Sequence, residues 1–145
     1  MAEPFLNEKH RVLRRSVRAF CEQELGPIAA QIDQEARFPW EVVEKMGALG
    51  FFGVQVPKEL GGAGMDSVSY AIVVEEISRI CASLGLCVTV HNSVAVYPIL
   101  AFGTEDQQKR VAQKAHRLML LEASLLTKDA VLDLFLYGTG PDRLY

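Results

Sequence analysis

The side chains able to do acid–base, nucleophilic or metal chemistry are few and scattered along this sequence. The three histidines, His10, His91 and His116, fall on separate expected helices, and none has a cysteine or carboxylate at metal-ligand spacing. We expect His10 and His116 to be surface residues. His91 precedes Asn92 and Ser93 in an apolar stretch. It is therefore either a buried histidine bonded to a nearby backbone carbonyl or part of a polar group lining an apolar pocket.

Neither the cysteines nor the paired glutamates form a recognisable catalytic arrangement. Cys21, Cys81 and Cys87 have no close partner at metal-ligand spacing, and an odd number argues against a disulfide framework. We expect Cys81 and Cys87 to be small buried hydrophobes in a reducing compartment. Glu75 and Glu76 are adjacent, so on a helix they point about 100° apart and do not converge on one substrate atom. We expect both to lie on a solvated face.

A glycine-rich run at residues 61–64 is the one candidate phosphate cradle. It lacks the Lys-Ser/Thr of a Walker loop and the GxGxxG spacing after a strand. We therefore interpret it as a permissive turn leading into a helix. The preceding stretch, Phe51 to Val56, is apolar and predicts extended backbone that Pro57 closes.

The first half of the chain predicts three helices. Asn7 is a good N-cap for a helix to about Glu24, with Leu13, Val17, Phe20 and Cys21 on one face. Gly26-Pro27 interrupts that helix, and a short second one follows. Pro39 is well placed to open a third. Its expected inward face comprises Val42, Val43, Met46 and Leu49.

The second half predicts longer helices, which complete an all-α, up-and-down helical bundle. Asp66 is a plausible N-cap for a helix to about Ile80, and an apolar helix follows from about Ser83 to Ala101. Gly103 ends that helix, and Thr104 with Gln107 forms a capping box for the next, which we expect to continue to about residue 126.

Composition narrows the class of protein. The chain has 145 residues, enough for one domain, and half of them are hydrophobic. A net charge of −3 gives no basic field for nucleic acid or an anionic membrane. The first residues do not have the pattern of a signal or transit peptide.

No charged residue occurs from Ile80 to Thr104, but several polar residues interrupt this stretch, so we expect a core helix and no membrane span.

Five motifs in order give the sequence a family resemblance. They are Phe38-Pro39-Trp40-Glu41 with Leu49-Gly50-Phe51-Phe52-Gly53, then Pro57-Lys58-Glu59-Leu60-Gly61-Gly62-Ala63-Gly64, Val74-Glu75-Glu76-Ile77-Ser78-Arg79, His91-Asn92-Ser93, and Gly103-Thr104-Glu105-Asp106-Gln107. Together, over about Phe5 to Arg110, they resemble the N-terminal helical domain of the acyl-CoA dehydrogenases, the short- or branched-chain group above all.

The resemblance implies a reaction and a set of site residues. Complete members bind FAD between a β-domain and a C-terminal bundle, and a glutamate removes the α-proton of acyl-CoA while hydride leaves for the flavin. Carried over, Leu86, Cys87, Val90 and Val94 would line the acyl end of the substrate pocket. The spacing of Cys87, Val90 and Val94 independently places these three on one helix face. We expect no catalytic, flavin-binding or metal-binding residue in this chain.

The resemblance stops after Arg110. A Thr/Ser-Glu-Pro-Gly-x-Gly-Ser-Asp segment, which meets flavin and substrate in the family, does not occur in residues 111–145. We therefore divide the chain into a helical domain, residues 1–110, and a divergent, mostly helical tail, residues 111–145. We expect a protein of the bacterial cytoplasm or mitochondrial matrix that binds no FAD and is inactive by itself. The alternative is a non-catalytic helical interaction module that forms homo-oligomers or pairs with a full-length dehydrogenase or another partner.

Overall fold

The computed structural model describes residues 6–109, and these residues form helices joined by turns, with no strand among them. The expected all-α fold is confirmed. The α-helices are α1 (Glu8–Phe20), α2 (Ala29–Gln34), α3 (Trp40–Ala48), α4 (Ser67–Ile80), α5 (Ala82–Val90) and α6 (Tyr97–Phe102). Two π-helical turns, η1 (Cys21–Leu25) and η3 (His91–Val96), and one 3-10 turn, η2 (Lys58–Leu60), complete them. His116 and the tail from residue 111 lie outside the described residues.

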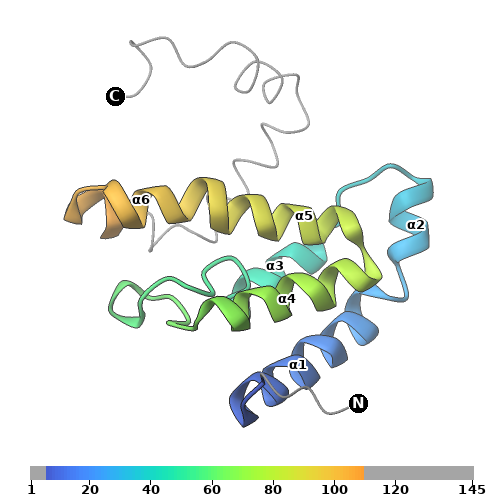
Figure 1. Ribbon diagram of the computed structural model, residues 1–145. Helices are drawn as coiled ribbons and strands as arrows, with labels where there is room; N and C mark the ends of the chain where they lie inside the picture. Colours follow the sequence, from blue (N-terminus) through green and yellow to red (C-terminus); the bar gives the residue numbers. More distant parts are fainter. Residues whose placement is uncertain (1–5, 110–145) are drawn as a thin grey trace, which may run out of the picture.

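Helix α4 is the central element of the bundle. It packs against α1 on one side and against α5 on the other (Figure 1). Cys81 alone connects α4 to α5, and its extended backbone turns the chain back on itself. As a result α5, η3 and α6 run as one long rod beside α4 in the opposite direction (Figure 1).

The expected helix starts are confirmed at atomic detail. Asn7 caps α1 by accepting a hydrogen bond from the backbone N–H of His10 at 2.9 Å. Asp66 caps α4 in the same way through the N–H of Ser69 at 2.8 Å. Thr104 and Gln107 exchange the two hydrogen bonds of a capping box after Gly103 ends α6. Side-chain caps satisfy backbone donors that a helix start leaves free.

The π-helical turns precede prolines. Pro98 lies in the first turn of α6, directly after η3, and Pro27 follows η1. A proline inside a helix removes one backbone donor and crowds the carbonyl four residues earlier. A wider turn before it relieves that crowding, so the rod from Ala82 to Phe102 continues through Pro98 without breaking.

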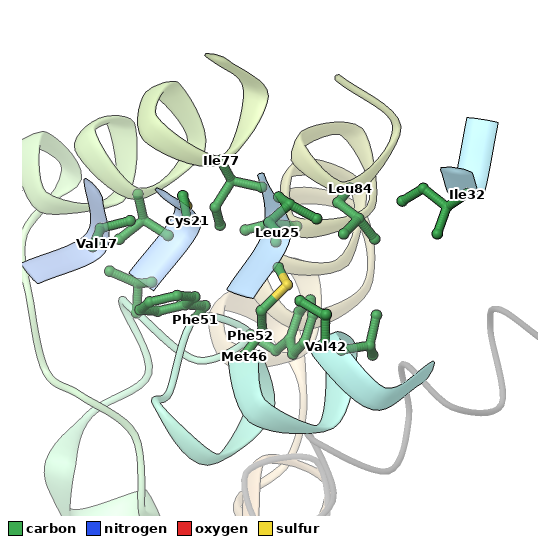
Figure 2. Packing of buried hydrophobic residues seen from close by; sticks show 14 residues of the cluster. Val17, Cys21, Leu25, Ile32, Val42, Met46, Phe51, Phe52, Ile77 and Leu84 are labelled. Carbon is green, nitrogen blue, oxygen red and sulfur yellow. The ribbon is translucent and has the colours of Figure 1, made fainter. Parts of the chain in front are cut away.

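One core holds the helices together. Val17, Cys21 and Leu25 from α1 and η1 meet Ile77 of α4 and Leu84 of α5 on one side, and residues of α3 and the following turns on the other (Figure 2). The buried members from α3 and those turns are Val42, Val43, Met46, Phe51, Phe52 and Val54. The expected inward faces of α1 and α3 are therefore confirmed, apart from one residue of α3.

Two expectations for this region were wrong. Leu49 is 55% exposed, because α3 ends at Ala48 and the chain leaves the helical register there. Residues 51–56 are not extended but form successive turns, in which the N–H of Gly53 bonds to Gly50 and that of Val56 to Gly53. Consecutive turns can bury a run of apolar side chains. In the sequence such a run looks the same as a strand that is buried on both faces.

The apolar rod is exposed along part of its length. Ala82–Phe102 is long and apolar enough to cross a bilayer by length and composition, but only 33% of its most apolar window is buried inside the described protein. The rod is thus a core helix on one side and an open apolar surface on the other, so the expectation of a core helix holds for one side alone.

Candidate functional site

The four residues expected to line an acyl pocket lie on the outer part of the rod. Leu86, Val90 and Val94 are 62%, 36% and 56% exposed, and they share one side of the helix. Cys87 lies at the edge of this side, half-buried, where it borders a groove of about 300 Å³ that α2 and the residues before α3 also line. The structure therefore brings three of the four together on an open face and places the fourth at its border.

The sequence analysis missed one residue of this face. Tyr97 is 59% exposed and continues the row three residues beyond Val94. We refer to Leu86, Val90, Val94 and Tyr97 as the outer row. Extending the helical spacing past the His91-Asn92-Ser93 motif would have found Tyr97, because Pro98 does not break the rod.

The polar trio His91-Asn92-Ser93 has a structural role in the described protein. His91 is 1% exposed and meets the ring of Phe52 edge to face, with centroids 5.4 Å apart. Asn92 donates to the carbonyl of Phe51 at 3.0 Å and to that of Val88 at 2.9 Å. These contacts tie the rod to the turns of residues 51–56 and so fix the side of the rod that the outer row occupies.

The glycine run is a turn, as the sequence predicts, and its backbone N–H groups donate hydrogen bonds within the protein. Gly61 and Gly64 have φ of 86° and 60°, which glycine adopts without strain. The N–H groups of Gly62, Ala63 and Gly64 donate to the carbonyls of Pro57, Gly53 and Val56 at 3.1, 3.0 and 2.8 Å. A phosphate cradle needs free N–H groups, so this turn does not form one.

Glu75 and Glu76 were both expected on a solvated face. That expectation was right for Glu75 and wrong for Glu76. The Glu76 side chain is 1% exposed and accepts two hydrogen bonds from Arg18, at 2.7 and 2.9 Å, and a third from Arg79 at 3.4 Å. The Arg18 guanidinium holds the pKa of Glu76 below its ordinary value, with a smaller contribution from Arg79. The Glu75 side chain, 61% exposed, pairs with Arg14, whose Nε also lies 3.6 Å from Oε1 of Glu76.

His10 is also buried, contrary to expectation, at 6% exposure. Its Nδ1 accepts from the N–H of Asn7 at 3.4 Å, and its Nε2 lies 2.9 Å from Asp66. The N–H of Ser69 and then the His10 imidazole lower the pKa of Asp66 to about 2. The pair joins the N-termini of α1 and α4, and this role uses both ring nitrogens.

Cys21, the fully buried cysteine of the core, is not an activated nucleophile. Burial raises the pKa of the Cys21 thiol to about 11, with the Glu76 carboxylate adding to the effect. A raised pKa keeps the thiol protonated and unreactive at neutral pH. Within residues 6–109, no three histidine, cysteine or acidic side chains gather to hold a metal ion. The open apolar row is therefore the candidate functional site.

Comparison with known proteins gives this geometry a family context. The family described as "Acyl-CoA dehydrogenase, N-terminal domain" matches residues 7–117. The mitochondrial short-chain specific acyl-CoA dehydrogenase of Bos taurus is 52% identical over 105 residues, which cover 72% of this chain and 26% of that protein. The short-chain specific enzyme of Clostridium acetobutylicum is 44% identical over 105 residues, covering 72% of this chain and 28% of that protein.

Solved structures agree with the sequence comparison. Glutaryl-coenzyme A dehydrogenase in its glutaryl-CoA complex superposes with a TM-score of 0.73 at 36% identity, over 79% of this chain and 30% of that one. An acyl-CoA dehydrogenase complexed with FAD from Bacillus anthracis gives 0.72 at 26% identity, over 80% and 20%. The chain spans about a quarter of the length of the curated relatives it matches. Through its N-terminal helical domain, the chain belongs to the acyl-CoA dehydrogenase family.

Proposed function

We propose that the outer row and Cys87 form the acyl-chain side of an acyl-CoA substrate pocket. One observation carries the proposal: three exposed aliphatic side chains, continued by Tyr97, lie in a row on a rod with no charged residue between Ile80 and Thr104. A short acyl chain gains about 0.8 kcal/mol for each methylene that leaves water, so an open apolar helix side is a suitable wall for it. The coenzyme A end and the reacting carbons would lie beyond this wall.

The family reaction is FAD-dependent α,β-dehydrogenation of acyl-CoA, and we propose that residues 1–145 by themselves do not carry it out. Two features support this. The amides of the glycine run are bonded within the turn, so they do not hold the pyrophosphate of a flavin nucleotide. The buried carboxylate of Glu76 is held by arginines from α1 and α4 and does not face the outer row. A base for the α-proton of the substrate must reach that proton, which Glu76 does not.

An absorption spectrum and an activity assay test the proposed lack of dehydrogenase activity. The purified chain is incubated with FAD, desalted and scanned in the visible, then assayed for butyryl-CoA oxidation with an artificial electron acceptor. We expect no retained flavin band and no turnover. Flavin retained at one per chain, together with butyryl-CoA-dependent reduction of the acceptor, would show that residues 1–145 form a complete enzyme and would refute the proposal.

A second candidate function is a non-catalytic interaction module, supported by the same open face. An exposed apolar surface of this kind marks interaction sites on many proteins. The chain would then form a homo-oligomer or pair with a full-length dehydrogenase through the outer row. Sedimentation of the chain with and without a full-length relative distinguishes this role: a mixed complex that Val90→Asp abolishes supports it, and a monomer that binds neither counts against it.

We propose the following organisation and location for the chain. Residues 1–110 are the helical acyl-CoA dehydrogenase-like domain, and residues 111–145 are a separate tail. The relatives include mammalian proteins named as mitochondrial and a clostridial enzyme. A bacterial cytoplasm or mitochondrial matrix suits a protein with three cysteines and a described part in which none forms a disulfide. Fractionation of the source cells tests the location directly.

A further inference from the structure

A groove of about 300 Å³ lies where α2, the residues before α3 and the first turns of α5 meet. Its lining is mostly apolar. Ile32 of α2 and Leu84 of α5, which are both buried at one end of the core (Figure 2), line it together with Phe38. The volume is at the lower end of the range for small-molecule pockets, which begins at about 300 Å³. The groove is therefore large enough for part of a ligand, such as the end of a chain.

The groove begins where the outer row ends. Cys87 lies three residues before Val90, and Ser83 lies three residues before Leu86, so each is one helical turn beyond a member of the row. Both Ser83 and Cys87 line the groove. On an α-helix these four residues fall within about 100° of arc. An extended ligand that lies along the row therefore reaches the groove on the same side of the rod.

The charges at the groove favour an uncharged ligand end. The rod contributes no charged residue between Ile80 and Thr104, so the charged groups come from the opposite wall. On that wall, the Arg37 guanidinium pairs with Glu41 at 2.8 Å and with Glu35 at 3.2 Å. Asp33 adds a further carboxylate that lines the groove. These carboxylates outweigh the guanidinium, which disfavours a ligand that ends in a carboxylate.

We propose that this groove accepts the far end of an acyl chain whose first part lies along the outer row, so that the site takes apolar acyl groups longer than butyryl. The proposal rests on the acyl-pocket role proposed for the row. From Val90 to Ser83 the helix advances about 10 Å, at about 1.5 Å per residue. An extended acyl chain advances about 1.3 Å per carbon, because its zigzag bonds are about 1.5 Å long. A decanoyl chain, at about 12 Å, spans this distance, whereas a butyryl chain, at about 4 Å, stays within one turn of the row.

Photolabelling with two CoA thioesters tests the proposal on the full chain. One probe is butyryl-CoA and the other is decanoyl-CoA, each with a diazirine at the end of the acyl chain, and the labelled peptides are identified by mass spectrometry. We expect the butyryl probe to label the rod between Leu86 and Tyr97. The decanoyl probe should label residues 29–39, which form the wall of the groove opposite the rod. This wall is far from the rod in the sequence, so the two results fall on different peptides.

A variant that fills the mouth of the groove provides a second measurement. Ser83 is exposed and lines the groove, so Ser83→Phe narrows it without disturbing the core. Keeping about two methylenes out of the groove should weaken binding of decanoyl-CoA about 15-fold, measured by titration calorimetry, and leave butyryl-CoA binding unchanged. The matched control is Ala82→Phe, because Ala82 is also exposed on the same helical turn but lies outside the lining of the groove. It should change neither affinity.

Three results would overturn the proposal. Labels of both probes confined to the rod would exclude the groove and leave the acyl-pocket role of the row in place. Labels of neither probe on the rod or on residues 29–39 would refute the acyl-pocket role and the groove together. An equal loss of decanoyl-CoA affinity in Ser83→Phe and Ala82→Phe would also contradict binding in the groove.

Discussion

Replacing Glu76 with glutamine should destabilise the chain far more than the same change at Glu75. The Glu76 carboxylate is almost fully buried and receives three hydrogen bonds from Arg18 and Arg79. Glu76→Gln keeps the size of the side chain, so it opens no cavity. It removes the negative charge and leaves the arginine side chains close together without it.

The size of the effect follows from how far the arginines can return to water. Breaking a fully buried ion pair by removing one partner costs about 3–5 kcal/mol. Arg18 and Arg79 are 48% and 43% exposed, so water compensates part of the loss, and we expect about 2 kcal/mol. Glu75, 61% exposed, should lose no more than about 0.5 kcal/mol on Glu75→Gln.

The pH dependence gives the prediction a second signature. Arg18 lowers the pKa of folded Glu76, so this carboxylate stabilises the fold above its unfolded pKa, and the stabilisation is lost as the pH falls. Urea unfolding of the unmodified chain, Glu76→Gln and Glu75→Gln at pH 7 and pH 3.5 measures both effects. The difference between the unmodified chain and Glu76→Gln should shrink at the lower pH. Equal losses for the two variants at pH 7, or a difference that does not change with pH, would refute the reasoning.

Three further predictions follow from other contacts. Asn92→Ala should cost about 1–3 kcal/mol in urea unfolding, because it leaves the buried carbonyls of Phe51 and Val88 without that donor, whereas Ser93→Ala should cost little. The unmodified chain should lose stability between about pH 4 and pH 2 as Asp66, with its pKa of about 2, becomes protonated; Asp66→Asn should flatten this part of the acid-unfolding curve. Cys21, with its pKa of about 11, should resist iodoacetamide at pH 8 in the folded chain and react after unfolding in urea. Peptide mapping of the alkylated chain measures this difference. Rapid reaction of folded Cys21 would contradict its burial.

The features that local sequence determines were predictable. Asn7, Asp66 and Thr104 each cap a helix through a backbone N–H three residues away, so their roles depend on no distant residue. The apolar rod was recognisable because its residues lack charge over a long stretch. The spacing of Cys87, Val90 and Val94 placed these three on one side of the rod. Leu86 was named through the family resemblance alone, and Tyr97 was omitted.

The errors arose where a partner lies far along the chain. Glu76 and Glu75 are chemically identical, and only the position of Arg18, 58 residues away, decides that Glu76 is buried. His10 is buried because Asp66 lies beside it, 56 residues later. Periodicity along one helix contains no information about such pairs, since tertiary packing selects them.

Photolabelling with an acyl-CoA that carries a diazirine at the end of a short acyl chain tests the acyl-pocket proposal most directly. The unmodified chain and Val90→Asp are labelled in parallel and mapped by peptide mass spectrometry. We expect labels on the segment from Leu86 to Tyr97 in the unmodified chain, and Val90→Asp should remove them. Labels spread over other helices, or none on this segment in either chain, would contradict an acyl-binding role for the row.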